Sequence, residues 1–351
     1  MEASIDSIAG TIRRSLNFPE RTKGHGFSEE IHEGSFEEIV CKDEDREEGR
    51  GVPLSAIDGG SCTVLRTPTM AIVLNRVYCN KFIGMEKGNF VERFSFLSKT
   101  EIATKGGKVF FDTQIVPQEG EFTLGALQID SEDPEFKVGK ARGDLGRAIS
   151  MARRFCEWSF VRRALRSSAR FIVMDGSLQT GFPGESELAN VIYGEVESAG
   201  VKLSGLSKNT TIFTEEGFPV AGFANELARK RGFGKWLLSL GRNDEWAHRA
   251  EVYLAKLHEG ADRPYRLDVF EGITREDLEG LVCALQSNSR YFAFPGYPYA
   301  LIDAHTYGRV QEEEAMHIRD QILDRLDLED ARKLEQVERA LAGHDILDEL
   351  G

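Results

Sequence analysis

One short stretch, Arg170-Phe-Ile-Val-Met-Asp-Gly-Ser-Leu178, constrains the fold more than any other part of the chain. Residues 171–174 are apolar without alternation, which is typical of a strand that is buried on both faces of a sheet. Asp175 follows at once. A carboxylate at the end of a buried strand is costly unless a cation meets it. The stretch therefore predicts a strand that is buried on both faces of a sheet and ends in an acid.

A second strand-like run leads into an acid in the same way. Residues 52–57 are followed by Asp58-Gly59-Gly60-Ser61. Either Asp-Gly pair alone is typical of a hairpin turn, and this alternative stays open for each of them. Two such runs, far apart in the chain, favour two acids that meet at one sheet edge.

The order of the other expected elements indicates an α/β protein with a mixed sheet. Strands come first, and helices and strands then alternate. The strongest helix pattern covers residues 143–168, where an apolar stripe repeats at helical spacing. The remaining pattern predicts helices at 4–16, 185–198, 222–260, 306–326 and 328–342, and strands at 56–64, 70–78, 108–116, 201–206, 265–269 and 289–294.

Charge and turn residues divide the chain into three parts. Residues 1–50 end in a dense charged run and are expected to form an N-terminal arm. Residues 51–326 hold the main domain, with an acidic, turn-rich insertion around 118–139. Residues 327–351 are expected to add a C-terminal helix.

Composition limits the class of protein. No apolar run approaches the roughly 20 residues of a membrane helix, and the first residues lack the apolar block of a signal peptide. The five cysteines are scattered without a Cys-x-x-Cys pair, so we expect reduced thiols in a cytoplasmic protein. The net charge of -14 repels nucleic acid at long range. A nucleic-acid substrate would therefore need local basic patches, metal ions or a partner.

Chain lengths bring a third acid close to Asp175. From Glu157 to the expected helix end near residue 168 the chain rises about 16 Å. From Arg170 to Asp175 a strand returns about 17 Å. If a tight turn joins the two elements, Glu157 and Asp175 reach the same level. A solvated helix residue remains the alternative for Glu157.

A trio of Asp58, Glu157 and Asp175 at one sheet edge would be mutually repulsive at pH 7. Divalent cations relieve that repulsion, and carboxylates select Mg²⁺ or Mn²⁺ rather than zinc. His305 as a further ligand favours Mn²⁺, although a lone histidine is more often structural. Two such ions about 3.5–4 Å apart form the arrangement that hydrolyses phosphodiesters.

The motifs occur in a telling order. Asp-Gly-Gly-Ser on an early hairpin is followed by a helix Glu, a strand ending in Asp-Gly-Ser-Leu, then Gly-Leu-Ser-Lys, and Gly-Tyr-Pro with Ala-His near the C-terminus. This set, over residues 56–310, resembles the NurA family of DNA double-strand-break repair nucleases. The resemblance implies an RNase H-like mixed sheet flanked by helices, a homodimer and Mn²⁺-dependent cleavage of DNA. It also implies single-strand endonuclease and 5′-to-3′ exonuclease activity, and DNA end resection with a hexameric HerA-type helicase.

The resemblance also implies roles for single residues. Asp58, Glu157 and Asp175 match the three acids of the family, and Tyr297 and His305 match its last motif. The implied metal ligands are the three acids with His305. Tyr297 is then expected to take part in catalysis by positioning the DNA strand, and its alternative is a core aromatic.

Basic residues near the acids are the candidates for DNA contacts. Lys208 matches the lysine of the Gly-Leu-Ser-Lys motif, and Arg153 and Arg154 belong to an arginine-rich helix that could follow a phosphate backbone. A solvated surface is the alternative for all three. Asp303 would face the same side as His305 if the segment is extended, and it would then orient His305 or compete with it as a ligand.

Two other functions account for parts of the pattern. A phosphotransferase of the actin or sugar-kinase kind shares the Asp-Gly strand endings, but the chain has no P-loop motif. A non-catalytic adaptor would use the acids only as turn residues and its acidic surface to recruit a basic partner.

Overall fold

The computed structural model describes residues 5–10, 21–27, 29–38, 41, 51–122, 124–137, 139–243 and 248–341. Its main sheet is built from eleven strands: β3 (Phe36–Glu37), β4 (Pro53–Arg66), β5 (Met70–Ile83), β6 (Glu86–Lys105), β7 (Lys108–Glu119), β8 (Leu127–Asp130), β9 (Phe171–Asp175), β10 (Lys202–Ser207), β11 (Trp236–Gly241), β12 (Ala250–Lys256) and β13 (Tyr265–Phe270). A separate two-stranded sheet pairs β1 (Thr22–Lys23) with β2 (Glu30–Ile31).

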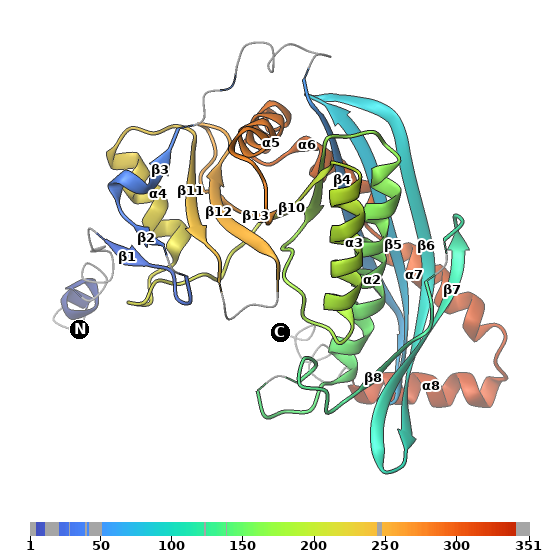
Figure 1. Cartoon of the computed structure of the whole chain (residues 1–351). Helices are drawn as coiled ribbons and strands as arrows, with labels where there is room; N and C mark the ends of the chain where they lie inside the picture. Colours follow the sequence, from blue (N-terminus) through green and yellow to red (C-terminus); the bar gives the residue numbers. More distant parts are fainter. Residues whose placement is uncertain are drawn as a thin grey trace.

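Helices pack against both faces of the main sheet (Figure 1). The helices from residue 145 onward are α2 (Leu145–Leu165), α3 (Glu185–Ser198), α4 (Val220–Lys230), α5 (Arg275–Asn288), α6 (Tyr299–Gly308), α7 (Glu312–Leu323) and α8 (Leu328–Leu341). No helix in the described ranges has both the length and the apolar character that crossing a membrane requires.

The strand order of the sheet is β3-β11-β12-β13-β10-β9-β4-β5-β6-β7-β8. Strands β4 to β7 form an antiparallel meander. The chain then crosses through α2 and returns as β9, which lies parallel to β4 and to β10. This order confirms the α/β class and the RNase H-like mixed sheet flanked by helices.

Strand β9 has the two-sided burial that its sequence predicts. Phe171 and Val173 belong to the core under α5 and α6, whereas Ile172 and Met174 belong to the core under α2 and α3. All four side chains are at most 1% exposed. Helices cover both faces here, so neither set of alternate residues can be polar.

The register of the parallel strands aligns the two acids. Ile57 of β4 pairs with Met174 of β9, so the residues that follow, Asp58 and Asp175, lie at the same level. Strand β4 continues to Arg66 as the partner of β5, and Asp58 therefore lies inside a strand rather than in a hairpin turn. The turn alternative is thus excluded for Asp58.

The expected helix over residues 222–260 is correct only as far as Lys230 and wrong beyond it. Helix α4 ends at Lys230, and Gly232 follows with φ of +77°, a left-handed conformation that ends helices readily. The apolar run from Trp236 forms β11, and β12 follows it in an antiparallel hairpin. Both strands are buried in the sheet, where pairing with neighbours outweighs local helical spacing.

Several other elements also differ from expectation. Residues 289–294 form a loop after α5, not a strand, and the expected helix at 306–326 is divided into α6 and α7. Helix α6 ends because Arg309 is extended, with φ of -61° and ψ of 136°. The insertion around 118–139 is not only a loop, because β8 adds the last strand of the sheet.

Each end of the chain contains part of an expected helix, whereas the short strands β1 to β3 were not expected. Residues 5–10 are helical, and the rest of the expected helix at 4–16 lies outside the described residues, as do residues 42–50 of the charged run. Strand β3 joins the edge of the main sheet through β11. Helix α8 covers the expected C-terminal helix as far as Leu341. The three-part division of the chain stays a prediction.

The expectation of reduced cysteines is wrong for one pair. Cys41 and Cys283 form a disulfide across 242 positions of sequence, with their Cα atoms 5.5 Å apart. The scattered spacing of cysteines contains no information on which of them the fold brings together, so this pairing could not be predicted. Cys62, Cys79 and Cys156 are free thiols, as expected.

Candidate active site

Three elements bring metal-ligating side chains together at the carboxyl end of β9, among the central strands of the sheet. Asp58 comes from β4, Asp175 from the end of β9, and His305 from α6. One ligand atom from each lies within 4.8 Å of the other two. His305 Nδ1 is 2.9 Å from Asp58 Oδ2. The structure thus assembles three of the four residues predicted as metal ligands.

Two glycines allow α6 to lie directly on β4. A Cβ atom on Gly60 would lie 2.6 Å from the carbonyl oxygen of Gly308, and a Cβ on Gly308 would lie 3.0 Å from the carbonyl oxygen of Asp58. Larger side chains would push the helix away from the strand. Gly60 therefore serves the approach of His305 to Asp58.

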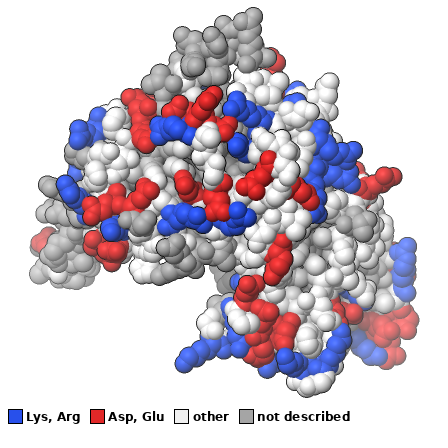
Figure 2. All heavy atoms as spheres, in the orientation of Figure 1, with Lys and Arg blue, Asp and Glu red and all other residues white. Residues whose placement is uncertain are grey.

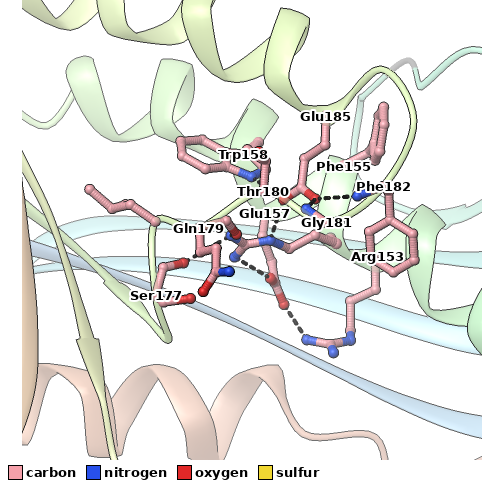
Figure 3. A network of polar contacts seen from close by, with 12 residues as sticks. Arg153, Phe155, Glu157, Trp158, Ser177, Gln179, Thr180, Gly181, Phe182 and Glu185 are labelled. Atoms are coloured by element: carbon pink, nitrogen blue, oxygen red, sulfur yellow. Dashed lines mark hydrogen bonds and ion pairs between the residues drawn. The ribbon is translucent and has the colours of Figure 1, made fainter. Parts of the chain in front are cut away.

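Glu157, the fourth predicted ligand, lies beside this group and pairs with two arginines. It is 4% exposed, and its carboxylate pairs with Arg153 and, at 3.7 Å, with Arg154 (Figure 3). A Cβ on Gly59 would lie 2.6 Å from Glu157 Oε1, so the carboxylate touches the residue that follows Asp58. The helix and strand lengths thus predicted its position, while two guanidinium groups determine its direction.

Burial and mutual repulsion act on the acids. Burial raises the pKa of Glu157 most, and the charge of Asp58 raises it further, while Arg153 and Arg154 lower it. Burial is also the main cause that raises the pKa of Asp175, followed by the charge of Asp58. A bound cation would favour the ionised carboxylates, because opposite charge at short range opposes both effects.

Both oxygens of Asp175 are held by neighbouring side chains. Lys208 Nζ donates to Oδ2 at 2.6 Å, and the Tyr297 hydroxyl donates to Oδ1 at 3.0 Å. Burial first, and then the charge of Asp175, raises the pKa of Tyr297 well above its usual value. The hydroxyl therefore remains a donor and fixes the rotation of the carboxylate.

The two arginines that were predicted to contact DNA differ in their surroundings. Arg153 donates to Glu157 and, at 3.1 Å, to the carbonyl oxygen of Gly59. The charge of Glu157 is the main cause that raises the pKa of Arg153, and Asp58 and Asp175 also contribute. Arg153 thus supplies positive charge to the acidic group.

Arg154 instead binds the loop that follows β9. Its guanidinium donates to Glu185 Oε1 at 2.7 Å and to the carbonyl oxygens of Ser177 and Gln179 at 2.9 and 3.2 Å. Its side chain is 15% exposed. Arg154 therefore positions this loop, and its contact with DNA stays a prediction.

Asp303 does not join the group. Residues 299–308 are helical rather than extended, so side chains two positions apart point in different directions. Asp303 is 8% exposed, accepts from Asn80 Nδ2 at 2.8 Å and pairs with Lys87 at 2.8 Å. The expectation that it orients or replaces His305 is wrong for this reason.

We predict that Asp303→Asn lowers stability but leaves metal binding intact. The amide cannot pair with Lys87, so the free energy of unfolding should fall by about 1–3 kcal/mol. The rise in melting temperature on adding Mn²⁺ should match that of the wild type, because Asp303 faces away from His305. Loss of that rise in a folded variant would place Asp303 among the ligands.

Glu185 is the functional neighbour that reasoning from sequence missed. It is 1% exposed and accepts from Trp158 Nε1 at 2.7 Å as well as from Arg154. Its second oxygen accepts from the backbone nitrogens of Gly181 and Phe182 at 2.8 and 3.1 Å (Figure 3). In sequence it is only an acid in the first turn of a helix, a common place for one.

The arrangement can now be compared with known proteins. The NurA domain model matches residues 52–310 of the chain. The chain belongs to the NurA family. Among solved structures, the NurA nuclease from Sulfolobus solfataricus is similar, with a TM-score of 0.49 and 13% identity over 93% of this chain and 96% of that chain. The catalytic domain of human Endonuclease V has a TM-score of 0.38 and 13% identity, over 82% and 92% of the two chains. No curated protein matches the sequence.

The donor set of the NurA chain fits a hard divalent cation. Two carboxylates and one imidazole converge within 4.8 Å, and thiols are not among the donors of this group. Oxygen donors with a single nitrogen suit Mg²⁺ or Mn²⁺ better than soft metals. Asp58, Asp175 and His305 are therefore the residues that would hold the ion.

Proposed function

We propose that this NurA-family chain is a metal-dependent DNA nuclease, a phosphodiester hydrolase with its active site at Asp58, Asp175 and His305. The observation that carries the proposal is that one donor atom from each of these three residues lies within 4.8 Å of the other two. Family membership supports a nuclease. Glu157 is proposed as a further ligand, since its carboxylate touches Gly59, the residue after Asp58.

A bound divalent ion would polarise the scissile phosphate and lower the pKa of a water at the site. The protein residues hold the geometry for this chemistry. Tyr297 and Lys208 fix the two oxygens of Asp175, and His305 is held against Asp58. We propose that Lys208, whose side chain is 35% exposed, and Arg153, at 29%, also offset the phosphate charge of the substrate.

Local positive charge can compensate for the acidic total of the chain. On the face drawn in Figure 2, acidic and basic side chains are interspersed rather than separated by sign. A net charge of -14 therefore does not produce a uniformly negative surface on this face. We propose that DNA approaches through the cations at the site, helped by the bound metal.

The finer parts of the proposal rest on the resemblance of the motifs. They are a preference for Mn²⁺, single-strand endonuclease and 5′-to-3′ exonuclease activity, and a role in DNA end resection and double-strand-break repair. A homodimer, a HerA-type helicase partner and a cytoplasmic location belong to the same proposal.

The proposal predicts cleavage that depends on a divalent ion. Purified protein is incubated with end-labelled single-stranded and duplex oligonucleotides in Mn²⁺, in Mg²⁺, without added metal and in EDTA. We expect shortened products in Mn²⁺ and none in EDTA, because the clustered carboxylates need the ion for substrate binding and for water activation. Turnover that persists in EDTA would overturn the proposal, and an ATP-induced rise in melting temperature without cleavage would favour a phosphotransferase.

A further inference from the structure

A cavity of about 380 Å³ is lined in part by Tyr265 and Phe294, whose rings contact that of Tyr297. Its walls include Tyr265, Phe294 and Pro295 on the apolar side, and Asp262 and Arg263 on the polar side. This volume lies within the range of small-molecule pockets, about 300–1,000 Å³. The Phe294 side chain is 44% exposed, so its ring is accessible from the cavity side.

Strand pairing places this cavity close to the carboxyl end of β9, where Asp175 lies. Ser207 at the end of β10 pairs with Arg266 near the start of the antiparallel β13, so Tyr265 and Lys208 lie at the same edge. The parallel partner of β10 is β9, which ends there with Asp175. The cavity wall at Tyr265 and the predicted metal ligand Asp175 therefore lie at the same end of neighbouring strands.

Ring contacts connect the cavity wall to Asp175. The Tyr297 ring lies 5.2 Å from the Tyr265 ring and 6.0 Å from the Phe294 ring, measured between centroids. The hydroxyl of the same Tyr297 donates to Asp175. Lys208 Nζ lies 5.3 Å from the centroid of the Tyr297 ring. One buried tyrosine thus separates the cavity from the group that would hold the metal.

Arg263 supplies a cationic side chain to the cavity wall. Arg263 donates to Asn209 at 3.1 Å, and Asn209 follows Lys208 directly in the chain. A pocket with aromatic walls and neighbouring cations has the chemistry of single-stranded nucleic-acid sites, in which rings stack on bases and cations follow the backbone. Duplex DNA offers no exposed base faces for such stacking, because its bases are stacked on one another.

We propose that this cavity binds an unpaired nucleobase of the substrate, next to the phosphate at the active site. The base stacks on Phe294, while Tyr265, which is 4% exposed, forms the buried wall of the cavity. Arg263 and Asp262 meet the polar edge of the base or the adjoining phosphate. The inference rests on the proposed nuclease function and adds to it a physical basis for choosing single strands.

The test compares oligonucleotides with and without bases. Binding of the full chain to a single-stranded oligothymidylate, and to the same sugar–phosphate chain made abasic, is measured by fluorescence anisotropy in EDTA. Phe294→Ala should weaken binding to the oligothymidylate by about 5- to 100-fold, and leave binding to the abasic chain within about twofold. Phe294→Trp, which keeps a stacking surface, should restore binding.

Phe292→Ala is the matched control. Phe292 lies on the same loop and is 88% exposed, but it does not line the cavity. The control should bind the oligothymidylate like the wild type. The pocket proposal would be wrong if Phe292→Ala and Phe294→Ala lost the same affinity for the oligothymidylate. It would also be wrong if Phe294→Ala lost as much affinity for the abasic chain as for the oligothymidylate.

The nuclease proposal and the pocket can fail separately. If the wild type cleaves DNA in Mn²⁺ but binds the abasic chain and the oligothymidylate equally, the pocket is wrong and the nuclease stands. If it prefers the oligothymidylate through Phe294 but never cleaves, the nuclease is wrong and the pocket stands.

Discussion

Replacing Asp175 by asparagine is expected to reduce metal-dependent DNA cleavage by on the order of 1,000-fold or more. The amide has nearly the shape of the carboxylate but lacks its charge, so the ion loses one of its two aspartate ligands. Several kcal/mol of transition-state stabilisation depend on that ion. The measurement is the rate of oligonucleotide cleavage in Mn²⁺, with Asp58→Asn as a second variant that should behave alike.

The same variant should remain folded, which separates catalysis from stability. Burial and the charge of Asp58 raise the pKa of Asp175, so above that pKa the ionised carboxyl group reduces the free energy of unfolding. A neutral amide removes this cost, and Lys208, at 35% exposed, can be solvated instead. The melting temperature in EDTA should therefore not fall sharply.

Metal binding provides an independent readout of the same substitution. The wild type should melt at a higher temperature when Mn²⁺ is added, whereas Asp175→Asn should show little of this rise. Asp320→Asn, an exposed aspartate on α7, is the control and should keep both the rise and the cleavage rate. A folded Asp175→Asn protein with wild-type cleavage would remove Asp175 from the active site.

The strand that carries Asp175 was predictable because local sequence dictates it. The unbroken apolar run 171–174 requires a strand covered on both sides, and helices on both faces provide that cover. The lengths of one helix and one strand suffice to bring Glu157 near Asp175. These inferences depend only on residues that are close together in the chain.

Prediction failed where distant pairing decides the structure. Residues 236–256 have apolar residues at spacings that suit a helix, but they form β11 and β12, which pair with neighbouring strands and are buried by packed cores on both faces. The error at Asp303 has a different origin, since Pro298 precedes α6 and proline is common where a helix starts. The proline was visible in the sequence, and it indicated a helix, in which Asp303 and His305 point in different directions.

The direction of a side chain was less predictable than its position. The Glu157 carboxylate lies beside Gly59, the residue after Asp58, and it pairs with Arg153 and Arg154. Charge partners four and three positions away on a helix are visible in sequence. Whether an acid pairs with such a partner or points toward a neighbouring strand depends on how deeply it is buried. Burial is known only from the fold.

Replacing Glu185 by alanine is expected to lower the free energy of unfolding by about 3–5 kcal/mol. Its carboxylate is 1% exposed and accepts from Arg154, Trp158 and two backbone nitrogens of the loop after β9. Without it, the Arg154 guanidinium, with a side chain only 15% exposed, stays buried without this partner. Chemical denaturation of the variant and the wild type measures the loss.

Glu195→Ala on the same helix is the control for that loss. Glu195 pairs with Arg162, and both side chains are about two-fifths exposed, so its removal should cost no more than about 1 kcal/mol. Equal losses for the two variants would mean that the network around Glu185 contributes no more than a surface ion pair. A larger loss at Glu185 should be accompanied by slower cleavage, because the loop that Glu185 and Arg154 hold begins directly after Asp175.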